Sequence, residues 1–339
     1  MPDTAIECRD LAKSFGRSCP ALQPALQGVS FTVARASVCA LLGHNGAGKT
    51  TTINILSTLV RPTAGSARVA GFDVEHQSAE VRASIGVTGQ SAALDEFLTA
   101  RENLTLFGQL RGLRHRSARR RADELIERFD MGHAADRRVS TYSGGMRRRI
   151  DIAVALVVPP RVLFLDEPTT GLDPRSRRDV WDLVSALRHQ NVTVLLTTQY
   201  LEEADVLSDS IIVLDSGRVV ASGTADDLKR RVGVSYCQVT PADPIDLPEI
   251  ATALADFAGC GTDCSALIDQ QAAAVSVPAP GGVVTFGEVF RRLDGLGIEL
   301  ADISLRKPSL DEAFLCLTSP ELTSPALTSP AHTSPALTG

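Results

Sequence analysis

The chain has 339 residues, 44 % of them apolar, which is long enough for two folded units with sizeable cores. Its net charge of −6 argues against bulk electrostatic binding to nucleic acid, so we expect no nucleic-acid partner. No apolar run reaches the roughly 18 to 20 residues of a membrane-spanning helix. The first residues also lack the charged start and apolar stretch of a secretory signal, which predicts a cytosolic protein.

The chain begins with a run of short strands. Residues 5–10 and 28–34 have the pattern of strands, and residues 37–42 have that of a buried strand that ends abruptly at Gly43. After this glycine-rich segment, the pattern becomes helical over residues 50–56. A buried strand, a glycine-rich turn and a helix therefore follow one another directly.

Three later segments, 162–166, 192–197 and 211–215, also read as strands. Two of them are continuous apolar runs with β-branched residues, as is typical of strands covered on both faces. Alternation of such strands with helices predicts a mostly parallel sheet and an α/β fold. Residues 94–158 are almost entirely helical in pattern, which predicts a helical insertion in this core. The insertion holds six arginines between residues 111 and 121, and we favour a solvated helix face over a binding patch for them.

The composition changes after residue 232. Alternating segments predict a small α+β domain over residues 233–317, for which a ferredoxin-like fold is one candidate. The expected strands are 235–240, 273–277 and 298–305, and the expected helices are 247–257, 286–296 and 309–317. In residues 318–339, Thr-Ser-Pro recurs with a period of five, and repeated proline with little to bury predicts disorder.

The seven cysteines are scattered along the chain, which in a cytosolic protein favours reduced and mostly buried thiols. Cys260 and Cys264 lie four residues apart, but no second Cys or His pair accompanies them. A zinc site needs such a second pair, so we favour free thiols over metal binding there.

The glycine-rich segment Gly43-His44-Asn45-Gly46-Ala47-Gly48-Lys49-Thr50 matches G-x-x-x-x-G-K-[ST], between a buried strand and a helix. Its glycines allow the backbone N–H groups to face inward at a helix N-terminus, where they bind phosphate. A plain glycine-rich turn is the alternative, but the context favours a P-loop. Lys49 is expected to contact the β- and γ-phosphates of ATP, and Thr50 to bind Mg²⁺. The predicted nucleotide-binding residues are Gly43, His44, Asn45, Gly46, Ala47, Gly48, Lys49, Thr50 and Thr51.

A second motif consists of four apolar residues followed by Asp166 and Glu167. Such a strand delivers its carboxylates to the edge where open α/β sheets bind ligands. Asp166 is predicted to bind Mg²⁺, as in other P-loop ATPases. Glu167 is placed to orient or deprotonate the attacking water. Alone, the pair could be a solvated strand end, but the P-loop makes the catalytic interpretation stronger.

A third motif, Tyr142-Ser143-Gly144-Gly145-Met146, precedes this pair by about 20 residues. Alone, it indicates a helix N-cap followed by a flexible turn. With the other two motifs, it resembles the signature of the ATP-binding-cassette (ABC) transporter ATPases, usually Leu-Ser-Gly-Gly-Gln. Tyr142 and Met146 depart from that pattern, whereas Ser143, Gly144 and Gly145, which would contact phosphate, are intact. The resemblance covers roughly residues 5–232 and implies a P-loop NTPase cassette over residues 1–232.

Other segments resemble further motifs of this family. Phe15 resembles the aromatic residue that stacks on adenine, and Gln90 resembles the Q-loop glutamine that senses Mg²⁺ and water. Asp173, in Pro-Thr-Thr-Gly-Leu-Asp-Pro, resembles the aspartate at the dimer seam. Taken singly, Phe15 could be a core residue and Gln90 a loop amide. Their order along the chain favours the functional interpretation.

One motif departs from the family. Gln199 occupies the place of the usual switch histidine. Glutamine can hydrogen-bond a γ-phosphate but cannot hold a proton or a positive charge. We therefore hypothesise that Glu167 alone activates water and that Gln199 only bridges phosphate to the backbone.

The resemblance also implies partners. In this family, two ATP molecules close a head-to-tail homodimer, each lying between one P-loop and the other subunit's signature. The family also implies a separate integral membrane permease and a peripheral position at the cytoplasmic face of the membrane. Apolar residues in 91–99 are expected to grip this permease.

The cargo is predicted from a narrower resemblance. Gln199 in its surrounding run and the ending Pro308 to Phe314 are similar to the daunorubicin-resistance branch of multidrug exporters. This implies an ATPase that drives efflux of a hydrophobic drug or antibiotic. The alternatives are another exporter or an importer, with lipid, polysaccharide or ion cargo. A soluble ABC ATPase acting on ribosomes or DNA is disfavoured, because the chain has a single P-loop and no sustained heptads.

Overall fold

The computed structural model describes residues 4–15, 24–89, 93–188, 190–232, 235–258, 267–269, 273–306 and 309–318. The chain divides into two compact units, Met1–Leu228 and Lys229–Gly339. Cys260 and Cys264, Gln90 and the Thr-Ser-Pro repeats after residue 318 lie outside the described residues. No helix in the described parts of the chain is long and apolar enough to cross a membrane.

The first unit contains a six-stranded sheet that confirms the predicted α/β fold. Its strand order is β10-β9-β3-β8-β7-β6, and all neighbours are parallel except the edge strand β10. Every residue of β3, β7 and β8 is buried, as the continuous apolar runs predicted. The strands are β3 (Val38–Leu42), β6 (Ile85–Thr88), β7 (Val162–Asp166), β8 (Thr193–Thr198), β9 (Ser210–Asp215) and β10 (Arg218–Gly223).

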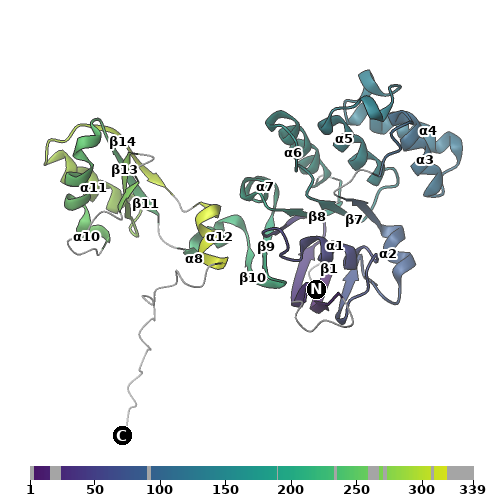
Figure 1. Cartoon of the computed structure of the whole chain (residues 1–339), viewed down its shortest axis with the longest axis horizontal. Helices are drawn as coiled ribbons and strands as arrows, with labels where there is room; N and C mark the ends of the chain where they lie inside the picture. The colour runs from purple at the N-terminus through teal and green to yellow at the C-terminus, as the bar shows by residue number, and fades with distance from the viewer. Residues whose placement is uncertain are drawn as a thin grey trace, which may run out of the picture. The chain divides into compact units, whose positions relative to one another are not determined.

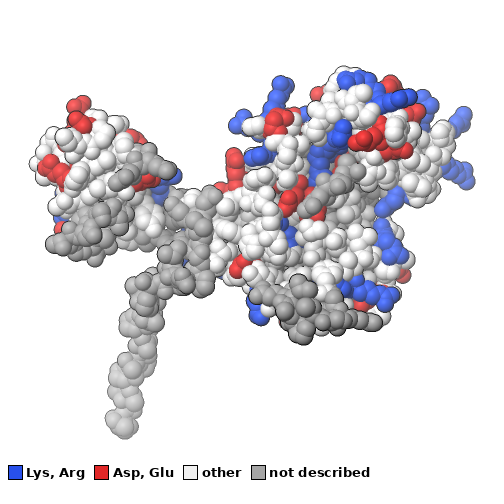
Figure 2. Space-filling model, in the orientation of Figure 1, with Lys and Arg blue, Asp and Glu red and all other residues white. Residues whose placement is uncertain are grey.

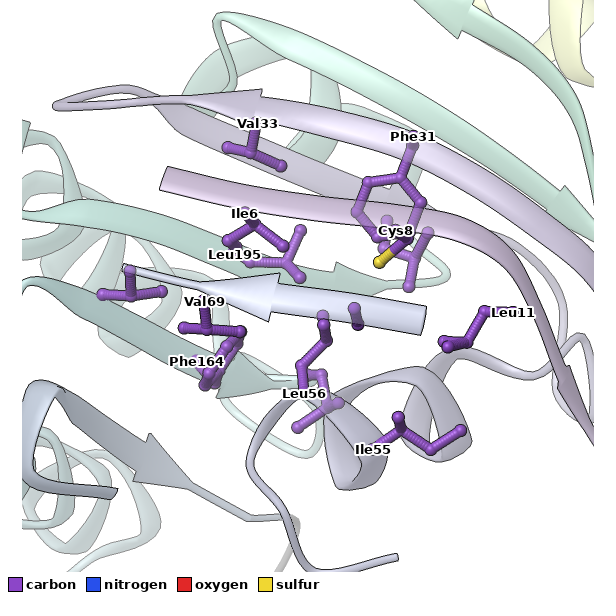
Figure 3. Close-up of a cluster of buried hydrophobic side chains, with 14 of the residues drawn as sticks. Ile6, Cys8, Leu11, Phe31, Val33, Ile55, Leu56, Val69, Phe164 and Leu195 are labelled. Atoms are coloured by element: carbon purple, nitrogen blue, oxygen red, sulfur yellow. The ribbon is translucent and has the colours of Figure 1, made fainter. Parts of the chain in front are cut away.

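A second, antiparallel sheet packs in the same unit. It contains β1 (Thr4–Lys13), β2 (Leu26–Ala34), β4 (Ala64–Val69) and β5 (Phe72–Asp73), in the order β2-β1-β4-β5. One buried cluster joins the two sheets around helix α1 (Lys49–Leu56), as Figure 3 shows. It includes Ile6, Cys8, Leu11, Phe31, Val33, Ile55, Leu56, Val69, Phe164 and Leu195. This core fixes the end of β3 relative to the start of α1.

The helices of this unit form two groups. Helices α3 (Ala100–Leu110), α4 (His115–Arg128) and α5 (Gly144–Ala155) lie together at one end of the unit, away from α1 (Figure 1). Two short 3-10 turns, η1 (Gly132–Ala134) and η2 (Val139–Thr141), connect α4 to α5. The remaining helices are α2 (Ser78–Ser84), α6 (Pro174–Arg188), α7 (Leu201–Leu207) and α8 (Ala225–Val232), and the division between the units falls within α8.

The arginine run of the helical group divides into two kinds of side chain. Arg114, Arg116, Arg119 and Arg120 are exposed, and basic side chains are prominent over these helices in Figure 2. Arg121 instead donates to the carbonyls of residues 156 and 157, both at 3.1 Å, at the end of α5. The solvated-face interpretation therefore describes most of the run, whereas Arg121 ties two helices together.

The second unit has one antiparallel sheet of order β12-β13-β11-β14. Its elements are β11 (Tyr236–Pro241), η3 (Pro244–Asp246), α9 (Leu247–Ala253), α10 (Ala255–Ala258), β12 (Ile268–Asp269), β13 (Ala274–Pro278), α11 (Val283–Asp294), β14 (Leu300–Arg306) and α12 (Leu310–Thr318). The order strand, helix, two strands, helix, strand is that of a ferredoxin-like fold. The single helix expected over 247–257 is wrong, because the chain turns at Leu254. This turn allows Leu254 and Phe257 both to pack in the core.

Three of the cysteines are free thiols. Cys8 and Cys39 are buried free thiols in the first unit, and Cys237 is one in the second. Burial raises the pKa of Cys39 to about 12 and that of Cys237 to about 11. These thiols are therefore core residues and do not act as nucleophiles.

Candidate active site

A cavity of about 840 Å³ opens beside the carboxyl ends of the parallel strands. Strands β3, β7 and β9 run parallel, so the residues that follow each of them meet at one edge of the sheet. The cavity is lined by residue 25, by 44–46 and 48–51 after β3, by 144, 147 and 148 from α5, and by 167, 168 and 170–172 after β7. Three segments distant in sequence, together with residue 25, thus share one site.

The P-loop, residues 43–50, curls tightly into the start of α1. Gly48 is the N-cap of this helix, with a φ of 106° in the left-handed region that favours glycine. A Cβ at Gly48 would lie 2.7 Å from the carbonyl oxygen of Ala25 and from a methyl of Leu26. At its other end, the amide of Gly43 donates to the carbonyl of Thr198 at 3.3 Å. The loop is therefore anchored to β8 and open toward the cavity.

Lys49 is a buried cation inside this loop, with only 4 % of its surface exposed. Its Nζ donates to the carbonyls of Gly43 at 2.7 Å and His44 at 3.2 Å, and it lies 3.5 Å from Glu167 Oε1. Burial lowers the pKa of Lys49, and the charge of Glu167 opposes this effect. A buried ammonium at a helix N-terminus, next to an open cavity, fits the phosphates of a nucleotide.

The two carboxylates that end β7 have different partners. Asp166 is buried and accepts from Thr197 Oγ1 at 2.5 Å and from Thr50 Oγ1 at 3.3 Å. Glu167 has a φ of 46°, in the left-handed region, and its amide donates to Thr197 Oγ1 at 3.0 Å. Its carboxylate accepts from Thr170 Oγ1 at 3.1 Å. The left-handed turn thus separates the two acids, one facing Thr50 and the other facing Lys49.

The residues of the predicted signature lie at the start of α5. Ser143 is the N-cap of this helix, and its side chain accepts from the amide of Met146 at 3.3 Å. Gly144 lines the cavity. Gly145 packs against α6, because a Cβ there would lie 2.5 Å from Ser176 Oγ. Asp173 accepts from the Ser176 amide and hydroxyl, which lowers its pKa. The structure therefore brings Gly145 and Asp173 to the same helix end.

Two other predicted residues lie away from the cavity lining. Phe15 is 54 % exposed, and Lys13 Nζ lies 5.1 Å from its ring centroid. Gln199 is half-buried just after β8 and makes no hydrogen bond with another described residue. Gln90 lies outside the described residues. Neither Phe15 nor Gln199 thus lines the cavity within this chain.

Sequence reasoning missed two residues that organise the site. Thr197 bonds to both Asp166 and the Glu167 amide, and Arg148 donates to the carbonyl of Asp166 at 2.9 Å. Thr197 could have been found as a hydroxyl at the end of a buried strand that neighbours β7. For Arg148 the available signal was an arginine three residues before an aspartate on the same helix.

His44 adds a titratable group at the rim of the P-loop. Its Nε2 lies 2.7 Å from Asp215 Oδ1, and its Nδ1 lies 2.7 Å from the carbonyl of Asn45. The carbonyl of Asn45 raises the pKa of His44 most, and Asp215 raises it further. This pair connects the P-loop to the end of β9.

Comparison with known proteins places this geometry in a family. A family model described as ABC transporter matches residues 26–170. The doxorubicin resistance ATP-binding protein DrrA of Mycobacterium tuberculosis is 52 % identical, over 94 % of each chain. The chain belongs to the ABC transporter family. It is an ATP-binding subunit and an ATPase whose hydrolysis of ATP is coupled to transport.

Two further proteins resemble this ABC ATPase. The daunorubicin resistance ATP-binding protein DrrA2 of Streptomyces coeruleorubidus is 49 % identical, over 94 % of this chain and 96 % of the relative. A solved structure described as the ATP binding subunit of an ABC transporter is 30 % identical, with a TM-score of 0.59. The match covers 67 % of this chain and 92 % of the solved chain, so the structural similarity spans one cassette. The DrrA relatives match nearly the whole chain of this ABC ATPase.

Proposed function

We propose that this ABC ATPase drives export of a hydrophobic drug or antibiotic through a separate membrane permease. The observation that carries the proposal is the identity of 52 % over 94 % of the chain with a doxorubicin resistance ATP-binding protein. A second relative of similar coverage is a daunorubicin resistance ATP-binding protein. Both relatives are named for resistance to a drug, and this supports export over import.

The residues of the cavity can be assigned roles in hydrolysis. The P-loop amides and Lys49 bind the β- and γ-phosphates of ATP. Glu167 orients the attacking water and accepts its proton, and its position beside Lys49 supports this role. Gln199 lies at the same edge of the sheet and bridges phosphate to the backbone when ATP binds. Gln90 is proposed to sense Mg²⁺ and water.

Mg²⁺ fits the oxygen ligands at Thr50 and Asp166. The two side chains are already in hydrogen-bond contact, and both offer the hard oxygen atoms that Mg²⁺ prefers. Among the described residues, no group of three His, Cys, Asp or Glu side chains could hold a metal ion. A site with few protein ligands is typical of Mg²⁺, which shares its remaining positions between water and phosphate. When bound, the ion neutralises phosphate charge in the transition state.

We further propose that two copies form a homodimer closed by two ATP molecules. Ser143 and Gly144 of one copy would contact the ATP held by the other, with Asp173 at the seam. The amides at the start of α5 support this role, because they point from a helix N-terminus next to the cavity.

The permease would bind near Phe97, at the cytoplasmic face of the membrane. Phe97 is 81 % exposed, whereas Leu94, also within the expected contact segment, is only 9 % exposed. Aromatic side chains are enriched at protein–protein interfaces. Leu94 is part of the core and would not contact the permease.

The proposal is tested by transport with the complete system. The full chain is co-purified with the polytopic membrane protein encoded beside it, and ATP-dependent movement of doxorubicin is measured in vesicles. The matched Glu167→Gln chain should give no movement. ATP turnover without any drug movement would contradict drug export but not the ATPase. A neighbouring gene for a secreted binding protein would favour import instead.

A further inference from the structure

Helix α5 carries a buried ion pair between Arg148 and Asp151. Their exposed fractions are 9 % and 3 %, and Arg148 Nη1 donates to Asp151 Oδ2 at 3.1 Å. Burial lowers the pKa of Arg148 and raises that of Asp151, and each charge opposes the effect on the other. A buried ion pair is often no more stabilising than apolar residues of the same size. The role of this pair is therefore indicated by the other contacts that Arg148 and Asp151 make.

Arg148 brackets Glu167 from both sides. Its Nη2 donates to the carbonyl of Asp166 at 2.9 Å, and its Nε donates to the carbonyl of Pro168 at 3.0 Å. Between them, Glu167 adopts a left-handed φ of 46°, which is unfavourable for a residue with a Cβ. Such a conformation persists only where the surroundings over-determine it. One guanidinium thus holds the peptide group that precedes Glu167 and the peptide group that follows Pro168, which restrains the backbone on both sides of Glu167.

The same ion pair binds the backbone immediately before and after residues 90–92. Arg148 Nη1 donates to the carbonyl of Gly89 at 2.8 Å, and the amide of Ala93 donates to Asp151 Oδ1 at 3.3 Å. These four backbone groups come from two segments that are more than 70 residues apart in the sequence. A single buried pair on α5 therefore connects the end of β7 to the loop that follows β6.

We propose that Arg148 and Asp151 are positioning residues for ATP hydrolysis, which hold Glu167 toward the P-loop and link its backbone to the flanks of residues 90–92. The inference rests on the proposed role of Glu167. The proposed role requires arginine at position 148, because a planar guanidinium donates hydrogen bonds in several fixed directions at once. A lysine ammonium keeps the charge but cannot reproduce this geometry.

The test compares Arg148→Lys with Arg121→Lys in the full-length chain. Arg121 also donates to two backbone carbonyls in the helical group, but it contacts neither side of Glu167. Arg148→Lys should lower kcat about 10- to 100-fold, the loss expected for a misplaced catalytic group. Its affinity for ATP should stay within about twofold, because the P-loop is untouched. Arg121→Lys should retain both values.

A double-mutant cycle separates positioning from general loss of structure. If Arg148 acts through Glu167, Arg148→Lys should have no further effect on kcat in the Glu167→Gln chain. Independent, multiplicative losses would overturn the inference. So would parallel losses of ATP affinity and Tm in Arg148→Lys, which would indicate a merely structural pair. If that variant does not fold, Arg148→Gln with Asp151→Asn removes both charges together and avoids leaving one buried charge unpaired.

Hydrogen exchange without nucleotide gives a readout that does not depend on turnover. The amides of Ala93, Glu167, Thr169 and Thr170 should exchange faster in Arg148→Lys than in the wild-type chain or in Arg121→Lys. Unchanged exchange at both places would overturn the inference. Absence of turnover in the wild-type chain would contradict the proposed function, and the exchange result would still decide whether Arg148 holds this backbone.

Discussion

The two units use similar elements but place their polar residues differently. In the first unit, β3, β7 and β8 are parallel and completely buried, so the residues that follow them converge on one edge. In the second unit, the strands are antiparallel, and the burial of β11 alternates along its length. Successive strand ends of an antiparallel sheet lie at opposite edges. Parallel strand direction therefore gathers the polar residues of the first unit at one edge, and the antiparallel sheet of the second unit has no such edge.

The largest expected effect is that of Lys49→Ala in the first unit. The change removes a buried cation that compensates Glu167 and would bind phosphate. ATP binding and hydrolysis should both be lost, and equilibrium titration with ATP measures the first directly. Since Lys49 is nearly buried, a thermal melt should accompany the titration to show that the chain still folds. An unchanged nucleotide affinity would contradict the phosphate-binding role of the P-loop.

The next largest effect is that of Glu167→Gln. The substitution keeps the shape of the side chain but removes the base, so ATP binding should persist while turnover falls by about 10² to 10⁴-fold. Turnover is measured by phosphate release, and ATP-dependent dimer formation by light scattering. Gln199→Ala is the matched comparison and should have a much smaller effect. Loss of hydrolysis in Gln199→Ala with normal turnover in Glu167→Gln would reverse the two assignments.

The second unit offers a change that should leave the site intact. Ile250 is fully buried in the core of that unit, so Ile250→Ala should lower its free energy of unfolding by about 2 to 5 kcal/mol. ATP affinity should be unchanged, because all cavity-lining residues belong to the first unit. Chemical denaturation followed alongside ATP titration checks both expectations. A large loss of ATP affinity would show that the two units are not functionally separate.

The same contrast explains how much the sequence could predict. The strands β7 and β8 were predictable because continuous apolar runs with β-branched residues identify buried strands. Strands β4 and β5 were not, because β4 is mostly exposed and β5 has only two residues. The turn at Leu254 was also not predicted, since the helical spacing of apolar residues continues through this position.

The site was predictable where its chemistry is local in sequence. The P-loop and the Asp166–Glu167 pair are short motifs, and each lies where a strand ends. The left-handed turn at Glu167 and its bracketing by Arg148 depend on backbone groups distant in the chain, so no local pattern reveals them. The roles predicted for Phe15 and Gln199 remain proposals, because neither side chain lines the cavity within one chain.

The smallest expected effect concerns pH and the rim of the P-loop. The Asn45 carbonyl and Asp215 raise the pKa of His44 in the folded chain above its ordinary value of 6.5. A raised pKa means that the interaction stabilises the fold fully below pH 6.5 and that this contribution is lost as pH rises through the folded value.

Thermal melts between about pH 5.5 and 8.5 should therefore show a small decrease in stability that is absent in His44→Gln. The effect should be slight, because half of the His44 side chain is exposed and solvent screens the pair. Asp215→Asn serves as the partner control and should lower the pKa of His44, as measured by NMR titration. An unchanged pKa in Asp215→Asn would mean that the backbone carbonyl of Asn45 alone holds the proton. In that case the pKa of His44 would depend on the backbone of the P-loop and not on the contact with Asp215 at the end of β9.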